Sequence, residues 1–172
     1  MKIIFLDIDG VLNNLEHCNW IHTNVKKGGG FGQHWELDRG NFDEITVGWD
    51  RRNIDAFMHI VDTTNAKVVI SSTWRTGRTV KFFKDCFRTY LNRTPDIINF
   101  TDEFSRFRGD EINQYLKHHN YIDSWVCLDD DSDFYPENNL VQTDIQVGLT
   151  MDDAKKAIKI LGAKEWKKSM QQ

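Results

Sequence analysis

Two aspartates near the start of the chain, Asp7 and Asp9, interrupt an otherwise apolar segment, IIFLDIDGVL. A carboxylate can attack phosphorus and form an aspartyl-phosphate, and a second carboxyl group can protonate the leaving oxygen and later accept a proton from water. The pair therefore predicts Asp7 as a nucleophile and Asp9 as a general acid and base. Gly10 follows and permits a sharp turn with close approach of the backbone.

Polar residues also follow later segments of the chain. Ser71 and Arg75 come after the apolar run KVVI, and Arg108 stands just before a helical pattern. The run SWVCL is followed by four acids in five residues, which are Asp129, Asp130, Asp131 and Asp133. Ligands of open parallel sheets bind outside the carboxyl ends of the strands, so we expect these side chains to meet at one edge.

The chemistry of this set suits a hard cation and a phosphate. Carboxylates that converge from two strand ends repel one another at low dielectric, so their coexistence calls for a cation, and oxygen ligands favour Mg²⁺. We predict a magnesium site made by four acids, Asp7, Asp9, Asp129 and Asp130. Whether Asp130 or Asp133 accompanies Asp129 is left open, with Asp130 favoured. Hydroxyl and guanidinium groups suit a phosphate, which predicts phosphate binding by Ser71, Arg75 and Arg108.

The periodicity of apolar residues alternates between strand and helix along the chain. Strands are predicted at 2–7, 67–72, 96–100 and 124–129, with a fifth at 139–143. Helices are predicted at 54–61, 80–91, 109–119 and 150–161, the last with Thr150 and Asp153 as a capping box. This alternation predicts an α/β fold, in which helices cover both faces of a mostly parallel sheet.

The length of 172 residues suits one domain, and we predict a single domain over residues 1–172. Residues 13–50 do not follow the alternation of strands and helices. They are rich in glycine and aromatic residues and too long for an ordinary connection, which predicts a small cap or lid inserted over the edge of the sheet. A disordered excursion is the alternative.

Composition and charge bear on the cell compartment and on the kinds of partner that the protein is expected to have. The net charge of −4 argues against coating nucleic acid by bulk electrostatics. Three cysteines without CxxC spacing argue against a disulfide framework or structural zinc, and favour the reducing cytoplasm. The sequence holds no apolar stretch of about 18 residues, so we expect no membrane association, and no obligate protein partner is evident.

Four motifs, in this order, resemble those of the haloacid dehalogenase-like (HAD) phosphohydrolase superfamily. They are DIDGVL, VVISSTWR, the basic residue within RFRGDEI, and CLDDDSD. The chain is further similar, through SSTWR and GLT, to a HAD subgroup associated with RNA repair and nucleic-acid end processing.

The resemblance implies a Rossmann-like fold and dependence on Mg²⁺. It implies Asp7 as nucleophile, and Asp9 as general acid and base with its backbone carbonyl on the metal. Ser71 would hold the transferring phosphate, and Asp129 or Asp130 would complete the metal site. Arg108 would take the place usually filled by lysine, with Lys117 as the alternative.

The predicted function is therefore a Mg²⁺-dependent phosphomonoesterase that forms an aspartyl-phosphate. Its expected substrate is a nucleic-acid phosphate end, as for a 3′-phosphatase, or a nucleotide; the choice between a 3′- and a 5′-phosphate is left open. A small-metabolite or protein phosphatase, and a catalytically idle HAD fold that serves as a binding module, are the alternatives.

Basic and aromatic residues bear on the substrate. The segment from Arg75 to Arg93 contains six basic residues and one acidic residue, Asp85. Lys81, Lys84 and Arg88 share one side of a predicted helix, which makes them either a track for a phosphate backbone or a solvated face. Four of the six tryptophans, at positions 20, 35, 49 and 74, would either stack on bases or belong to the core.

Overall fold

One parallel sheet organises the computed structural model, which describes residues 1–24, 48–132 and 139–162. Its strands are β1 (Lys2–Leu6), β2 (Lys67–Ile70), β3 (Ile97–Phe100), β4 (Ser124–Asp129) and β5 (Leu140–Gln142). They pair in the order β3-β2-β1-β4-β5, and every pairing is parallel. The central strand β1 is buried on both faces, which explains why its sequence is continuously apolar.

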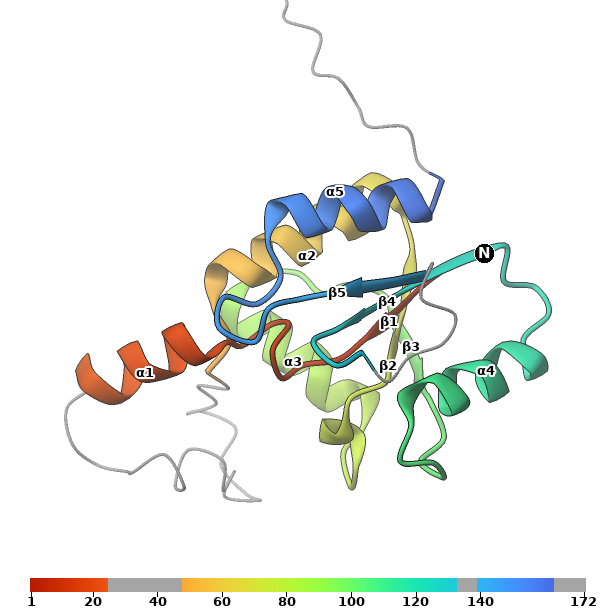
Figure 1. Ribbon diagram of the computed structural model, residues 1–172, viewed down its shortest axis with the longest axis horizontal. Coiled ribbons are helices and arrows are strands. Elements are labelled where there is room, and N and C mark those ends of the chain that lie inside the picture. The colour runs from red at the N-terminus through yellow and green to blue at the C-terminus, as the bar shows by residue number, and fades with distance from the viewer. Residues whose placement is uncertain (25–47, 133–138, 163–172) are drawn as a thin grey trace, which may run out of the picture.

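Helices cover both faces of this sheet. They are α2 (Arg51–Thr64), α3 (Val80–Tyr90), α4 (Arg108–His118) and α5 (Met151–Ile160). The chain also forms a helix α1 (Leu15–Asn24) outside these layers and a short 3₁₀ turn η2 (Thr73–Arg75). Helices α2, α3 and α5 share a core cluster with Ile4 and Leu6, whereas α4 packs on the face that carries Ile3 and Phe5. Figure 1 shows α2 and α5 side by side, with α4 on the opposite side of the sheet. The predicted α/β, Rossmann-like fold is confirmed.

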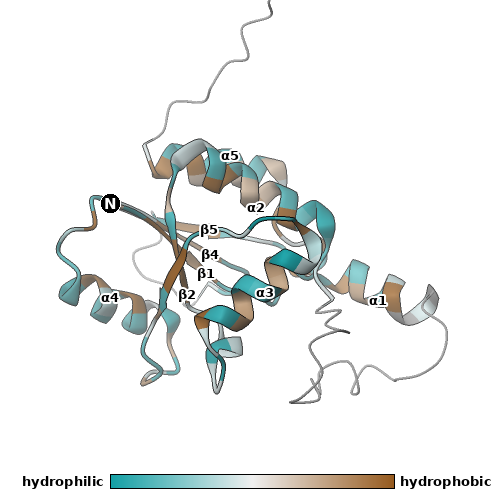
Figure 2. Ribbon diagram, turned by 180° about the vertical axis from the view of Figure 1, so that it is seen from behind, coloured by the Kyte–Doolittle hydropathy of each residue, from teal (hydrophilic) through white to brown (hydrophobic). Residues whose placement is uncertain are grey.

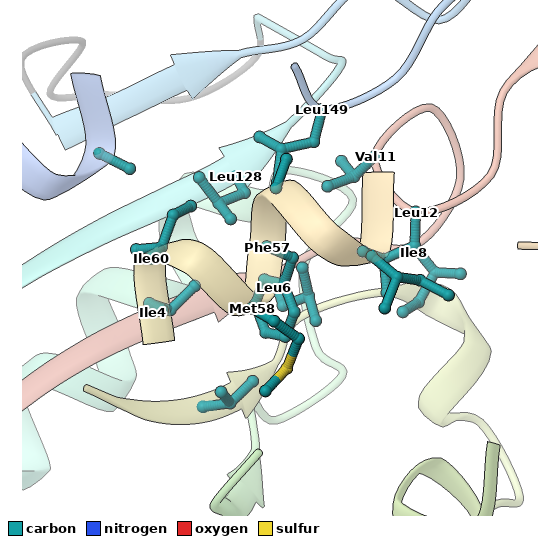
Figure 3. Packing of buried hydrophobic residues seen from close by; sticks show 14 of the residues in the cluster. Ile4, Leu6, Ile8, Val11, Leu12, Phe57, Met58, Ile60, Leu128 and Leu149 are labelled. Carbon is teal, nitrogen blue, oxygen red and sulfur yellow. The ribbon is translucent and has the colours of Figure 1, made fainter. Parts of the chain in front are cut away.

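The packing follows from the amphipathic pattern of each helix. Figure 2 shows apolar and polar residues alternating along α3, α4 and α5, as expected for helices with one buried side. Figure 3 shows Phe57 and Ile60 of α2 beside Ile4 and Leu6 of β1. Helix α2 therefore packs against the face of the sheet to which Ile4 and Leu6 of β1 point.

Most predicted elements are confirmed, with differences of a few residues at their ends. The capping box at the start of α5 is present, since Thr150 Oγ1 accepts from the Asp153 backbone N–H while the Asp153 side chain accepts from the Thr150 N–H. The predicted cap at 13–50 includes α1, which projects from the body of the molecule in Figure 1. Residues 25–47 of this cap lie outside the described residues. Among the described segments, no helix is long and apolar enough to cross a membrane.

Candidate active site

The predicted site residues meet at the carboxyl ends of β1, β2 and β4. In the sheet register, Leu6 is paired with Ile70 on one side and with Leu128 on the other. The backbone N–H of Asp7 donates to Leu128 O at 3.0 Å, and that of Ser71 donates to Leu6 O at 3.0 Å. The sheet therefore brings Asp7, Ser71 and Asp129 to one edge, as the sequence predicts.

Three carboxylates form a cluster at this edge. Asp7, Asp129 and Asp130 each offer one oxygen, and these oxygens all lie within 4.8 Å of one another. Burial raises the pKa of Asp129 to about 7, and the charge of Asp7 acts in the same direction. Burial also raises the pKa values of Asp7 and Asp130. Crowded, desolvated carboxylates favour the protonated form unless positive charge balances them.

The donor set fits a divalent cation. Asp129 Oδ2 is buried and has no hydrogen-bond partner in the described part of the chain. Hard carboxylate oxygens that converge from two loops are ligands that Mg²⁺ prefers in proteins. Asp130 belongs to this cluster, whereas Asp133, the alternative ligand, lies outside the described residues.

Arg108 provides the positive charge beside these acids. It is the first residue of α4, and its side chain is 15% exposed. Its guanidinium lies 3.5 Å from Asp7 Oδ1 through Nη2 and 3.3 Å from Asp129 Oδ2 through Nε. Lys117, the alternative basic residue, lies in the last turn of the same helix, about 13 Å further along its axis. The structure thus brings Arg108, and not Lys117, to the carboxylates.

Arg75 is buried, and its contacts differ from the predicted contact with phosphate. Its guanidinium donates to three backbone carbonyls, Ser71 O, Ser72 O and Thr101 O, at 2.6 to 3.0 Å. Its Nη2 also donates to Glu111 Oε2 at 2.7 Å, and both side chains of this ion pair are less than 5% exposed. The predicted phosphate contact does not fit this arrangement, because the guanidinium already braces the loop after β2.

Glu111 links the two arginines of the site. Its Oε2 accepts from Arg75 and lies 3.6 Å from Arg108 Nη1. One buried carboxylate therefore balances part of the charge of both guanidinium groups, and it holds Arg108 from the side opposite the acid cluster. Sequence reasoning missed Glu111, because its spacing of three residues from Arg108 is common on any helix surface.

The Asp9 carboxylate is held by side chains rather than by the other acids. Its Oδ1 accepts from Asn13 Nδ2 at 2.7 Å, and its Oδ2 accepts from Trp74 Nε1 at 2.9 Å. Its carboxylate is not part of the three-acid cluster. Burial raises the pKa of the Cys18 thiol of α1, and the charge of Asp9 acts in the same direction.

Gly10 lets Asp130 approach the first loop. Its φ is +68°, and a Cβ added here would lie 2.4 Å from Asp130 Cγ. A side chain at this position would therefore collide with Asp130. It would also have to adopt a positive φ, which residues other than glycine avoid. Thr143, which follows β5, donates from its Oγ1 to Gly10 O at 2.7 Å and fixes the same loop from the far side.

A family comparison agrees with this geometry. The model described as the HAD domain in Swiss Army Knife RNA repair proteins matches residues 3–154. The chain belongs to this family. The match covers the four motif regions and confirms both the HAD resemblance and its RNA-repair subgroup. No curated protein and no solved structure matches the chain.

A pocket of about 190 Å³ opens beside the carboxylates of this HAD domain. It lies between η2 and the start of α4, and its lining includes Thr73, Arg106, Arg108 and Asp129. The Ser71 hydroxyl is fully buried and has no hydrogen-bond partner among the described residues. Ser72, predicted as a turn or cap residue, caps η2 by accepting from the Trp74 N–H.

The basic stripe of α3 and the tryptophans, which were considered for substrate binding, are only partly available at the surface. On α3, Lys81 and Arg88 both pair with Asp85, so the basic stripe is partly neutralised. Trp49 and Trp74 are buried in the core, whereas Trp20 on α1 is 58% exposed. Trp35 lies outside the described residues. Of the four tryptophans, Trp20 alone has an exposed ring in the described part of the chain.

Proposed function

We propose that this HAD domain is a Mg²⁺-dependent phosphomonoesterase that forms an aspartyl-phosphate on Asp7. One observation carries the proposal: Asp7 lies beside Arg108 and within the cluster of Asp129 and Asp130, at the edge where Ser71 follows β2. This arrangement unites a nucleophile, a cation for phosphate oxygens and an acidic cluster. Metal-dependent phosphoryl transfer through an aspartyl-phosphate uses all three.

Each of the residues at this site has its own role in the two steps of the reaction. A carboxylate oxygen of Asp7 attacks phosphorus while the bond to the leaving oxygen breaks, and Asp9 gives its proton to that oxygen. Water next attacks the aspartyl-phosphate, Asp9 takes a proton from this water, and inorganic phosphate leaves with Asp7 restored. Arg108 donates N–H groups to the phosphate oxygens, and the Ser71 hydroxyl donates a further hydrogen bond.

Asp7, Asp129 and Asp130 would hold the magnesium ion, together with the backbone carbonyl of Asp9. When bound, the ion supplies positive charge that neutralises the phosphate and the acid cluster. Asp129 is suited to this role because its Oδ2 has no other hydrogen-bond partner among the described residues.

The proposed substrate is a nucleic-acid phosphate end, with the 3′-phosphate favoured. The RNA-repair context of the family supports this substrate class. The basic stripe of α3 adds little support, since Asp85 pairs with two of its members. A nucleotide, a small metabolite or a phosphoprotein remains as the alternative substrate, and each is an arm of the test below.

Phosphate release tests the proposal. The wild-type protein is compared with Asp7→Asn on oligonucleotides carrying a 3′- or a 5′-phosphate, on mononucleotides, on a sugar phosphate and on a phosphopeptide, with Mg²⁺ or with chelator. We expect Mg²⁺-dependent release, fastest from the 3′-phosphorylated oligonucleotide and lowered by about 10³-fold or more in Asp7→Asn. Asp55→Asn, an exposed acid on α2, is the matched control and should retain activity.

Each other outcome has a definite meaning. A preference for mononucleotides, sugar phosphates or the phosphopeptide would keep the chemistry and replace the substrate. Release that persists in Asp7→Asn would contradict the mechanism. If no substrate releases phosphate while the 3′-phosphorylated oligonucleotide still binds, the domain is a binding module and not an enzyme.

A further inference from the structure

Both oxygens of the Asp9 carboxylate are held by side chains from two different loops. Asn13 Nδ2 donates to Oδ1 at 2.7 Å, and Trp74 Nε1 donates to Oδ2 at 2.9 Å. Asn13 comes from the loop after β1, whereas Trp74 comes from η2, which follows β2. The same 3₁₀ turn follows directly on Ser71 and Ser72, so one short segment holds both the predicted phosphate-binding serine and a donor to Asp9.

The donors themselves are rigidly placed. The Trp74 side chain belongs to the core cluster and is 8% exposed, and the guanidinium of Arg78 lies 5.5 Å from its ring centroid while donating to Trp74 O. Asn13 accepts from the Gly10 N–H through Oδ1 at 3.0 Å, which orients its amide group so that the Nδ2 faces Asp9. Neither donor is free to follow Asp9 if its carboxyl group turns.

We propose that Trp74 is the positioning residue for Asp9, with Asn13 as its partner on the other carboxyl oxygen. The inference rests on the proposed function. The two donors hold the Asp9 carboxyl group in place beside the cluster of Asp7, Asp129 and Asp130, of which it is not a member. As the proposed proton donor, Asp9 would meet the leaving oxygen in this orientation. Each carboxyl oxygen has a second lone-pair site, so Asp9 can carry or accept a proton without losing either contact.

This role predicts a dependence on the leaving group. When the bond from phosphorus to an alkyl oxygen breaks, the departing alkoxide needs the proton from Asp9. A nitrophenolate leaves without help, because its negative charge is delocalised into the ring. Loss of the Trp74 N–H should therefore slow the transfer from alkyl phosphates much more than that from aryl phosphates, since proton transfer is sensitive to small displacements of the donor.

The test compares Trp74→Phe with Trp49→Phe. The first variant keeps an aromatic ring and removes the N–H on Asp9. The second is a matched control, because the Trp49 Nε1 is buried with no hydrogen-bond partner among the described residues. The measured quantity is kcat/KM with Mg²⁺ for p-nitrophenyl phosphate and for a 3′-phosphorylated oligonucleotide, whose leaving oxygen is an alkoxide.

We expect Trp74→Phe to lower kcat/KM for the alkyl substrate by about 10- to 100-fold and for p-nitrophenyl phosphate by less than about threefold. Trp49→Phe should change both values by the same small factor. An equal loss on both substrates in Trp74→Phe, or no loss on either, overturns the inference while the proposed function stands. If the wild-type protein hydrolyses neither substrate, the proposed function fails, and the inference fails with it.

A spectroscopic measurement covers the case in which Trp74→Phe does not fold. The indole N–H resonance of Trp74 is followed in the wild-type protein and in Asp9→Ala, with the Trp49 resonance as an internal reference. We expect the Trp74 signal to move upfield when its acceptor is removed. An unchanged Trp74 resonance would show that its N–H does not hold Asp9, which overturns the inference.

Discussion

Arg108 and Arg75 both line the pocket beside the acid cluster, but their guanidinium groups have different partners. Arg108 faces Asp7 and Asp129 at ion-pair distances with part of its surface exposed, whereas Arg75 is surrounded by backbone carbonyls and Glu111. A buried, fully bonded guanidinium stabilises the loop it braces, and an exposed one can exchange its contacts for a phosphate.

Replacing these arginines separates the two roles. We expect Arg75→Lys to lower the free energy of unfolding by about 3 kcal/mol, because lysine cannot satisfy three carbonyls and Glu111 at once. Its KM should change little where the protein is folded. Arg108→Lys should cost less stability and raise KM by about tenfold, since a point charge replaces a forked donor. Denaturant unfolding and steady-state kinetics measure both, and a large KM effect in Arg75→Lys would restore its predicted contact with phosphate.

Gly10 allows the first loop to pass close to the acid cluster, because it has no side chain. A Cβ here would meet Asp130 at 2.4 Å, so Gly10→Ala should displace Asp130 and raise the Mg²⁺ concentration for half-maximal activity by about tenfold. Gly162→Ala is the control, because Gly162 has a similar φ of +67° with nothing within 4 Å. Both variants should lose about 1 kcal/mol of stability from the positive φ. Equal Mg²⁺ dependence in the two variants would contradict this account of Gly10.

At the scale of elements, buried amide groups tie α2 to the loops around the site. Asn53 on α2 donates to Val147 O and Leu149 O, and its Oδ1 accepts from Asn14 Nδ2 at 2.7 Å. Asn14 also donates to Asp50, the N-cap of α2, and accepts from the His17 N–H at the start of α1. These contacts set the position of the loop that carries Asp9 relative to α2 and to residues 147–149.

Replacing Asn53 by alanine should weaken the junction that joins α2 to Asn14 and to residues 147–149. We expect Asn53→Ala to lower the free energy of unfolding by about 2 kcal/mol, because the buried carbonyl of Leu149, the part-buried carbonyl of Val147 and the Asn14 amide all lose their partner. Asp55→Ala, on the exposed side of the same helix, should cost less than about 0.5 kcal/mol. Urea denaturation measures both values. A loss in Asn53→Ala as small as that in Asp55→Ala would show that the junction adds little to stability.

The whole molecule should respond to pH through its acid cluster. The pKa of Asp129 is about 7 in the folded protein against 3.8 for an ordinary aspartate, and burial raises the pKa values of Asp7 and Asp130 as well. Between about pH 4 and pH 7, the folded protein binds protons that the unfolded chain has released. Stability in the absence of divalent cations should therefore fall as the pH rises through this range.

Thermal unfolding in chelator measures this effect. We expect Tm to be lower at pH 8 than at pH 5 by roughly 5 °C, and Mg²⁺ to recover much of the difference at pH 8 because it binds the ionised carboxylates. Asp129→Asn should show a smaller pH dependence and a smaller gain from Mg²⁺. The same pH dependence in the wild-type protein and in Asp129→Asn would contradict the assignment of this titration to the cluster.

Much of the fold could be predicted because its signals are local. The apolar runs of β1, β2 and β4 mark strands buried on both faces, and the polar residues that follow them must share one edge of a parallel sheet. Asp7, Ser71 and Asp129 were therefore located from sequence alone. The family match agrees with the order of the motifs along the chain.

The supporting residues of the site could not be predicted, because their roles depend on contacts between distant segments. Trp74 and Asp9 are 65 residues apart, and Glu111 meets Arg75 across 36 residues. The prediction for Arg75 followed from its charge and its place after Ser71, and neither reveals that the side chain turns inward. Burial of a charge is visible only once the loop after β2 and the helix α4 are placed together.

The measurement that tests the central claim most directly is the detection of a phosphoryl group on Asp7. The wild-type protein, Asp9→Asn and Asp7→Asn are each mixed with Mg²⁺ and p-nitrophenyl phosphate, whose leaving group needs no proton from Asp9. The samples are quenched in acid and examined by intact and peptide mass spectrometry. We expect one added phosphoryl group on Asp7, accumulating most in Asp9→Asn because that variant lacks the base for hydrolysis, and absent in Asp7→Asn. Turnover without any phosphoryl group on Asp7 in Asp9→Asn, or a phosphoryl group that persists in Asp7→Asn, would contradict this mechanism.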